Sequence, residues 1–193
     1  MSASPATILQ IVPELETGGA ELSAIEMAAA ITASGGRALV VSEGGRLEED
    51  LTRAGGELVR LPVASKNPLT ILANAGRIAA LARREGVSII PARSRAPAWS
   101  GLLAARRCGV PFLTTYHGAY NEQGAIKRFY NSVMVRGRVV IANSHYTARL
   151  IEERYGTPRA RIRVVHRGVG PAYEPGRTSA TDTAALRASW GVP

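Results

Sequence analysis

The amino-acid sequence predicts an α/β fold: a Rossmann-like parallel sheet with helices on both of its faces. Three observations predict it. Short apolar runs recur along the chain, and each is followed by a longer segment whose apolar residues have helical spacing. Glycine or proline stands at most of the junctions. Repeated strand–helix units of this length place parallel strands side by side through right-handed crossovers.

Seven strands are expected, because each is a short apolar run that stops at a proline, a glycine or a polar cluster. They are residues 7–12, 38–42, 57–61, 87–90, 111–116, 139–142 and 162–166. The first run stops at Pro13 and the third at Pro62, and proline cannot continue a hydrogen-bonded ladder. Runs that are apolar almost throughout are typical of strands buried on both faces of a parallel sheet.

Between the strands, apolar residues recur with the period of a helix. The expected helices are residues 20–32, 47–54, 67–85, 96–107, 126–135 and 144–155. The first carries Leu22, Ile25 and Ala29 on one face. The third begins favourably, because Asn67 can cap it and Pro68 fits its first turn. Glycine follows most of these segments and ends the helix.

Composition places the chain among globular proteins with one domain. Its 193 residues are 46% hydrophobic and 20% charged, and the apolar runs are too short to cross a bilayer. The amino terminus has no basic stretch before its first apolar run, so a secretory signal is not expected. The single Cys108 cannot form an internal disulfide or a cysteine-based zinc site, so we interpret it as a packing residue. A reducing cytoplasm is the expected compartment.

The chain is strongly basic, with 24 lysines and arginines against 15 acidic residues and a net charge of +9. Such a field attracts phosphates, anionic lipid headgroups or nucleic acid, although an arginine-rich proteome would give the same excess. The arginines are scattered and no aromatic residues interleave with them, so nucleic-acid binding is not expected. The three histidines share no metal-ligand spacing, so no metal site is expected.

One segment, residues 125–138, combines an apolar helical face with basic residues. The apolar side chains are Ile126, Phe129, Tyr130, Val133 and Met134, and the basic ones are Lys127, Arg128, Arg136 and Arg138. Two interpretations stay open. The helix packs on the core with a solvated basic face, or it docks on an anionic membrane surface.

Candidate ligand-binding residues follow the strands, because ligands bind outside the carboxyl ends of the strands in an open parallel sheet. After the first strand, Gly18 and Gly19 precede a helix, where the backbone can approach an anion; an ordinary tight turn explains them equally well. After the fourth strand, Arg93 and Arg95 flank Ser94 and can hold a phosphate or carboxylate, although a solvated surface explains each arginine slightly better on its own. After the fifth, His117 precedes a glycine at a position suited to touch substrate, and bonding to a loop carbonyl is the alternative.

The sixth and seventh strands are followed by weaker candidates. Asn143 and Ser144 come directly after the sixth strand, and a helix cap fully explains Ser144. Arg167 follows the seventh strand and fits a solvated turn as well as a ligand contact. The composition changes after residue 170, where prolines and small polar residues are typical of a connector, and residues 184–190 are compatible with a short helix. We therefore expect a domain over residues 1–170 and a connector over residues 171–193.

A series of loose motifs becomes specific through its order over residues 6–170. The motifs are Ile11-Val12-Pro13, Glu16-Thr17-Gly18-Gly19-Ala20-Glu21, Gly35-Gly36-Arg37, Ala92-Arg93-Ser94, Thr115-Tyr116-His117-Gly118, Ala142-Asn143-Ser144 and Val165-His166-Arg167-Gly168-Val169. Together they resemble the N-terminal domain of glycosyltransferase family 4, whose enzymes have the GT-B fold. The sequence is most similar in texture to bacterial enzymes of lipopolysaccharide or other cell-surface glycan assembly.

This resemblance implies a retaining hexosyltransferase with two facing Rossmann-like domains. The N-terminal domain mainly holds the glycan or glycolipid acceptor, the C-terminal domain mainly holds the nucleotide-sugar donor, and neither a metal nor a further cofactor is required. It implies that Gly18 and Gly19 approach the donor diphosphate and that His117 is the catalytic residue that contacts the donor sugar. Substrate binding is then expected from Arg93, Ser94, Asn143, Ser144 and Arg167.

Two positions depart from the family pattern. Pro91 stands where the turn after the fourth strand often opens with histidine, and Gly170 stands where the turn after the seventh often has aspartate. Residues 187–193 resemble the approach to a second domain, so we expect the donor-binding half to lie outside this truncated chain.

The chain alone is then expected to be inactive. A C-terminal domain in cis or in trans would complete it, or self-association would cover the half-cleft. The alternative is a non-enzymatic domain that docks on a membrane or a partner protein and binds glycolipid. The expected location is cytoplasmic, peripheral on the inner face of the cytoplasmic membrane.

Overall fold

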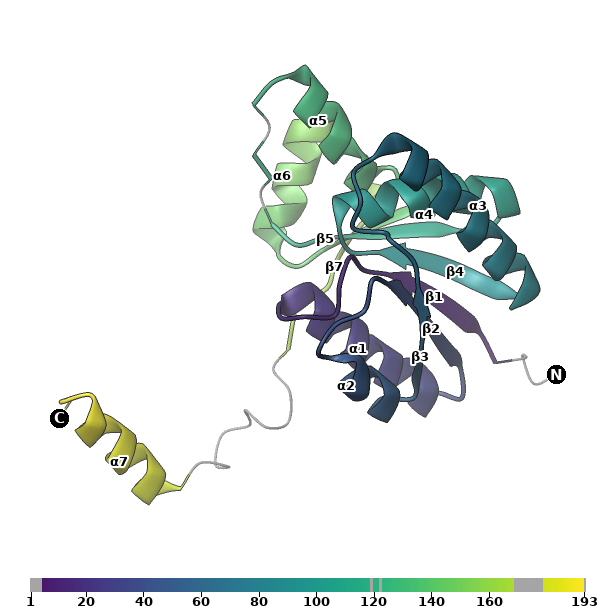
Figure 1. The fold of residues 1–193 in the computed structure, drawn as a ribbon. Helices are drawn as coiled ribbons and strands as arrows, with labels where there is room; N and C mark the ends of the chain where they lie inside the picture. Colours follow the sequence, from purple (N-terminus) through teal and green to yellow (C-terminus); the bar gives the residue numbers. More distant parts are fainter. Residues whose placement is uncertain (1–4, 119, 122, 169–178, 193) are drawn as a thin grey trace.

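The computed structural model describes residues 5–118, 120–121, 123–168 and 179–192. Its centre is one sheet of seven strands in the order β3-β2-β1-β4-β5-β6-β7 (Figure 1). The strands are β1 (Thr7–Ile11), β2 (Arg37–Ser42), β3 (Gly56–Arg60), β4 (Val87–Ala92), β5 (Phe112–Tyr116), β6 (Val139–Ala142) and β7 (Ile162–Val164). Every pairing is parallel, which confirms the predicted Rossmann-like sheet.

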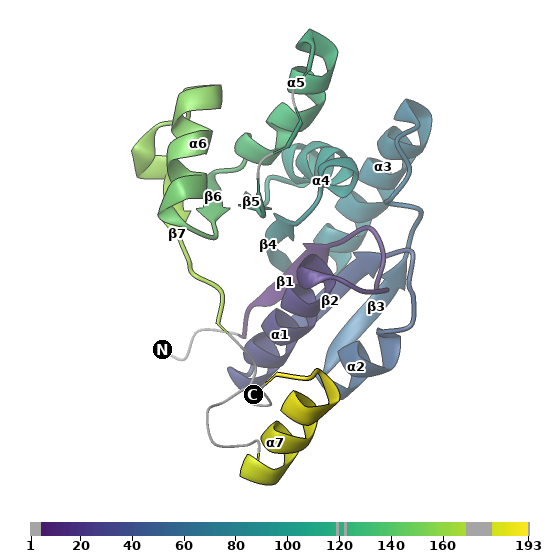
Figure 2. The ribbon, with the colours of Figure 1, turned by 90° about the vertical axis from the view of Figure 1, so that its left-hand side faces the viewer.

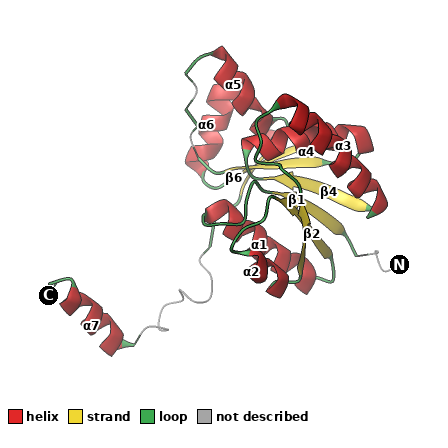
Figure 3. Cartoon of the chain, in the orientation of Figure 1, coloured by secondary structure: helices red, strands yellow, loops and turns green. Residues whose placement is uncertain are grey.

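Helices cover the two faces of this sheet unequally (Figures 1, 2 and 3). One face carries α1 (Gly19–Ala33) and α2 (Glu48–Arg53). The other carries α3 (Pro68–Arg84), α4 (Arg95–Cys108), α5 (Ala125–Asn131) and α6 (His145–Tyr155), with the short 3₁₀ helix η1 (Ser132–Val135); a second 3₁₀ helix, η2 (Arg159–Arg161), directly precedes β7. Right-handed crossovers explain this, because the strand order runs outward to β3 in one direction and outward from β4 in the other.

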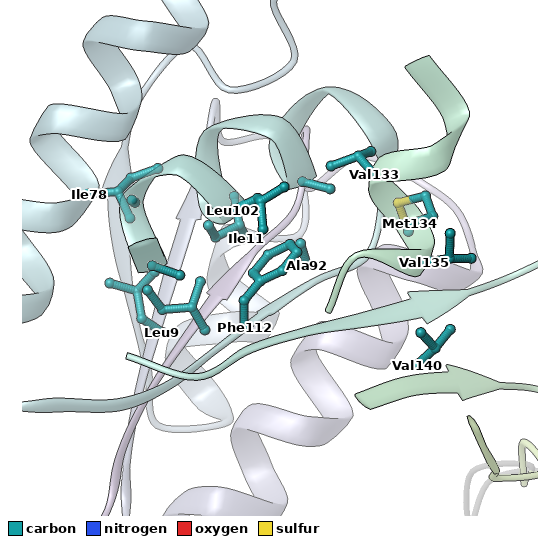
Figure 4. Close-up of a cluster of buried hydrophobic side chains, with 14 of the residues drawn as sticks. Leu9, Ile11, Ile78, Ala92, Leu102, Phe112, Val133, Met134, Val135 and Val140 are labelled. Carbon is teal, nitrogen blue, oxygen red and sulfur yellow. The ribbon is translucent and has the colours of Figure 1, made fainter. Parts of the chain in front are cut away.

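The larger apolar core lies between the sheet and α3, α4 and η1. Figure 4 shows its centre, where Ile78, Leu102, Val133 and Met134 from the helices meet Leu9, Ile11, Ala92, Phe112 and Val140 from the strands. The helix α4 lies close to the sheet at Gly101. A Cβ atom there would approach Ile11 Cδ1 to 2.8 Å and Phe112 Cε2 to 3.0 Å. A smaller apolar cluster joins α1 and α2 to the other face.

The fourth strand continues two residues beyond its predicted end, through Pro91 to Ala92. Successive residues of a strand point their N–H groups toward opposite neighbours. The Ile90 N–H donates to Pro111 O on the β5 side, so Pro91, which has no N–H, faces β1. The Arg93 N–H then resumes the bonding toward β1 by donating to Ile11 O at 3.3 Å. Proline therefore removes one ladder bond without ending the strand.

Most other boundaries lie within one residue or so of the sequence prediction, and two differ by more. The predicted helix 126–135 divides into α5 and η1, which leaves the apolar residues of its two parts in different surroundings. The seventh strand ends at Val164 because its neighbour β6 ends at Ala142, and the Val165 N–H donates to Ala142 O as the last contact between them.

The last helix, α7 (Ala180–Ser189), stands apart from the sheet (Figure 1). Ser179 caps it by accepting a hydrogen bond from the Asp182 N–H at 3.0 Å. It includes most of the predicted helix 184–190 but begins earlier, and none of its residues is buried. Residues 171–178 of the predicted connector, and Gly170, lie outside the described residues. Among the described helices, none has the length and apolar content needed to cross a bilayer.

Truncating Ile90 tests the core. Ile90 is fully buried in the central strand β4, and Ile90→Ala is expected to lower the free energy of unfolding by about 2–5 kcal/mol because it leaves a cavity. The matched control is Ile126→Ala on α5, where the side chain is 88% exposed and the expected change is within about 0.5 kcal/mol. Urea denaturation measures both; equal losses would contradict this placement of the core.

Candidate functional site

Alternate residues of three neighbouring strands form an apolar floor on the face that carries α1. They are Ile89 and Pro91 of β4, Leu113 and Thr115 of β5, and Ile141 of β6. One further step in the same alternation, just past each strand end, brings Arg93, His117 and Asn143 to this face. All of them line a cavity of about 450 Å³, and α1 forms its wall.

A second cavity, of about 300 Å³, lies over the carboxyl edge of the sheet. Its lining includes the first residues of α1 together with Ser94, Arg95 and Tyr120. Four polar residues line both cavities: Arg93, His117, Asn143 and Arg167. We call the first cavity the apolar trough and the second the polar mouth. The four shared residues mark the border between them.

Arg93 is the most deeply buried of these four residues, with 7% of its surface exposed. Its Nη2 donates to Gln10 Oε1 at 2.7 Å, and Gln10 Nε2 donates to Ala24 O of α1 at 2.9 Å. Its Nε has no hydrogen-bond partner among the described residues. Burial lowers the pKa of Arg93 to about 10, and repulsion from Arg167 adds to this while Glu26 opposes it. At neutral pH the guanidinium stays charged.

His117 is neutral at physiological pH. Burial is the main cause that lowers its pKa to about 4, and the charges of Arg93 and Arg167 contribute. Its Nε2 is buried and has no partner in the described part of the chain. The backbone is held in place, because Asn143 Nδ2 donates to His117 O at 3.0 Å and Thr147 Oγ1 donates to Asn143 Oδ1 at 2.7 Å. A neutral imidazole with one open nitrogen can exchange a hydrogen bond with a ligand hydroxyl.

Arg167 ties the turn after β7 to the beginning of α1. Its Nη2 donates to Gly19 O at 2.6 Å and to Ser23 Oγ. A Cβ atom on Gly19 would overlap the Arg167 guanidinium as it lies here, so a larger residue would displace this exposed side chain. Gly18 has φ +147°, a backbone conformation that favours glycine, and it precedes the first turn of α1. The glycine pair thus allows both the turn and the approach of Arg167.

The structure brings together most of the residues that the sequence singled out. Around the two cavities lie Gly19, Arg93, Ser94, His117, Asn143 and Arg167. Gly18 shapes the neighbouring turn without lining either cavity. Ser144 accepts a hydrogen bond from the Thr147 N–H at 3.0 Å and caps α6, and it lines neither cavity.

Sequence reasoning did not single out Gln10, which is fully buried and holds Arg93. Its signal is a polar residue inside an otherwise apolar strand. Within the described residues, no group of three or more histidine, cysteine, aspartate or glutamate side chains could hold a metal ion.

Comparison with known families identifies the chain. The sequence profile described as Glycosyltransferase Family 4 matches residues 17–173, which include every residue lining the polar mouth except Pro13. The chain belongs to glycosyltransferase family 4. Comparison of the sequence with curated proteins gives no significant match.

Solved structures share the fold of this chain. A glycosyltransferase from Rickettsia africae ESF-5 is 36% identical with a TM-score of 0.81, over 97% of this chain and 50% of that one. HepE of Anabaena in complex with UDP and glucose is 22% identical with a TM-score of 0.74, over 95% and 50%. Sucrose-phosphate synthase of Thermosynechococcus elongatus is 15% identical with a TM-score of 0.68, over 97% and 53%. The chain therefore spans about half the length of these structures and has the fold of the N-terminal half of GT-B glycosyltransferases.

The neutral state of His117 predicts a pH dependence of stability. Its folded pKa of about 4 lies below the ordinary value of 6.5, so the unfolded chain binds more protons between these pH values. Stability is therefore expected to fall as the pH drops from 6.5 to 4, and His117→Gln should lose less over the same interval. Thermal unfolding of both proteins across this range measures the difference. Identical pH profiles would show that His117 is not buried in its neutral form.

Proposed function

We propose that this chain is the acceptor-side domain of a retaining glycosyltransferase that uses a nucleotide-sugar donor. The observation that carries the proposal is the border of four polar residues between the two cavities. They follow β4, β5, β6 and β7 at the carboxyl edge of the sheet, beside the point where β1 and β4 are neighbours. Ligands of doubly wound sheets bind at this position. The glycine turn beside it offers backbone atoms and a helix N-terminus to an anion.

The site residues then divide between donor and acceptor. The turn at Gly18 and Gly19 admits the donor diphosphate, and the neutral imidazole of His117 orients a hydroxyl of the donor sugar. Arg93 and Ser94 receive the acceptor, with Asn143 and Arg167 holding the loops around them. Charge develops on the leaving diphosphate in the transition state, and preorganised donors must stabilise it. A second domain supplies the rest of that stabilisation.

Other proteins of the same fold support a nucleotide-sugar donor. HepE of Anabaena has been solved in complex with UDP and glucose and with UDP-glucose. The sequence texture supports a role in lipopolysaccharide or other cell-surface glycan assembly at the cytoplasmic face of the membrane. We propose the domain boundary at residue 170, with residues 171–193 leading toward a donor-binding domain. A separate chain or a second copy of this one could also cover the half-cleft.

Fusing this chain to a donor-binding domain tests the proposed division between acceptor and donor halves. The chain alone, and the chain fused to the second half of the Rickettsia africae enzyme, are titrated calorimetrically with UDP-glucose and GDP-mannose. The fusion is expected to bind one of these donors, and the chain alone is expected to bind neither at millimolar concentration. Tight binding by the chain alone would place the donor site here and contradict the division. Failure of the fusion to bind either donor would count against the glycosyltransferase proposal.

A second candidate function, docking on an anionic membrane, is favoured by the surface of α5. Ile126 is 88% exposed and Phe129 is 59% exposed, whereas Val133 and Met134 of η1 are buried. The Arg136 guanidinium lies 5.1 Å from the Phe129 ring centroid and 5.2 Å from that of Trp99. Exposed apolar side chains beside arginines suit the headgroup region of a bilayer. The helix also follows the loop that begins at His117, so a membrane-bound acceptor would reach the site.

Vesicle flotation tests the docking surface. The chain is expected to float with vesicles that contain anionic lipid and to stay behind with neutral ones. The double variant Ile126→Asp with Phe129→Asp should lose flotation because it places charge in the apolar patch. The control is Leu69→Asp on α3, where the side chain is 77% exposed outside this patch and no change is expected. Equal recovery with both vesicle types, or an unaffected double variant, would rule out this surface.

A further inference from the structure

Positive side chains outnumber negative ones around the two cavities. Among the described residues that line them, the arginines are Arg93, Arg95 and Arg167, and the carboxylates are Glu21 and Glu26. No ion pair joins either glutamate to these arginines within the described part of the chain. The excess charge of the site is therefore not cancelled locally.

Two of the three arginines have structural partners. Arg95 Nη1 donates to Asn131 Oδ1 at 3.1 Å, and its guanidinium lies 4.6 Å from the centroid of the Tyr120 ring. Arg167 donates to Gly19 O and Ser23 Oγ. Both side chains thereby fix loops at the edge of the sheet.

Arg93 differs because it is buried and forms no ion pair with a described carboxylate, although the charge of Glu26 acts on it from a distance. Its Nη2 bonds to a neutral amide, and its Nε finds no acceptor among the described residues. A buried charge without a counter-charge is costly to a folded protein. Such a group is retained at a binding site when the ligand brings the missing anion, and the planar guanidinium matches the oxygens of phosphate or carboxylate.

We propose that Arg93 binds an oxyanion of the acceptor, so that the acceptor is a sugar or glycan bearing a phosphate or carboxylate group. This inference rests on the proposed function, in which this half of the cleft holds the acceptor. Arg93 lies where the apolar trough meets the mouth, deeper than the glycine turn that admits the donor diphosphate. In the proposed function this half of the cleft holds the acceptor, so the acceptor is the substrate that reaches Arg93.

His117 reports on the anion. Arg93 and Arg167 both help to lower its pKa. An anion bound to Arg93 offsets this repulsion, so the pKa of His117 is expected to rise when the ligand binds. A role of Arg93 in folding alone would not produce this response.

Binding to the chain itself tests the proposal. The chain is titrated in turn with glucose 6-phosphate, glucuronate, neutral glucose and UDP. Binding is measured by calorimetry and by NMR of the histidine ring protons. At least one anionic sugar is expected to bind and to shift the titration midpoint of His117 upward, while glucose does neither. Arg93→Gln keeps an amide that can bond to Gln10 and should weaken this binding roughly 10- to 100-fold.

The control is Arg106→Gln. Arg106 is an exposed arginine near the opposite edge of the sheet, where it lines a different cavity. Arg106→Gln removes the same charge as Arg93→Gln. It should leave the affinity for the anionic sugar within about twofold of the unaltered chain, because salt screens the long-range field. Equal losses in the two variants would reduce the effect to net charge and overturn the proposal. Binding of UDP alone, weakened by Arg93→Gln, would assign the anion to the donor and also overturn it.

Two further outcomes are decisive. If Arg93→Gln does not fold, the wild-type His117 titration still decides, because an unchanged midpoint with both sugar anions contradicts the proposal. These readouts require no sugar transfer. A chain that binds anionic sugars, and whose fusion binds no donor, would keep this anion site and lose the proposed glycosyltransferase function.

Discussion

After β3 the chain crosses back over the sheet, and β4 pairs with β1 on the side opposite β2. The carboxyl ends of β1 and β4 therefore lie side by side, while the connections that leave them run to opposite faces. The glycine turn leads from β1 to α1, and residues 93 and 94 lead from β4 to α4. Gln10 of β1 can hold Arg93 only because these two strands are neighbours. The polar border of the site depends on this one reversal of strand order.

The unequal covering of the sheet gives the site its chemical character. Of the helices in the described residues, only α1 and α2 occupy one face, so Ile89, Leu113 and Ile141 stay half-buried and form a trough. Where the trough reaches the carboxyl edge, the strand alternation places polar side chains in line with these apolar ones. Burial keeps His117 neutral, and the charges of Arg93 and Arg167 add to this effect. A fixed cation thus stands beside an uncharged donor–acceptor group, a pairing that suits an oxyanion and sugar hydroxyls.

The sequence predicted the order of strands and helices well, because each element has its own local hydrophobic period. It placed the end of β4 too early, since the effect of Pro91 depends on which neighbour its missing N–H faces. The strand-end rule found Arg93, His117 and Asn143 without knowing the strand order. The sequence also predicted that Ser144 caps a helix, but it could not show that Gln10 and Gly19 contact Arg93 and Arg167. Those contacts join residues 83 and 148 positions apart, and only the folded sheet brings them together.

The most direct test of the account is a map of backbone amide shifts in isotope-labelled chain on addition of glucose 6-phosphate. Changes are expected at residues 19–21, 93–95, 117 and 143, which lie at the carboxyl edge of the sheet after β1, β4, β5 and β6. Changes confined to the cavity near the amino ends of β5 and β6, which Arg106, Arg138 and Arg161 line, would contradict it. So would spectra that stay unchanged both with glucose 6-phosphate and, in a second titration, with glucuronate.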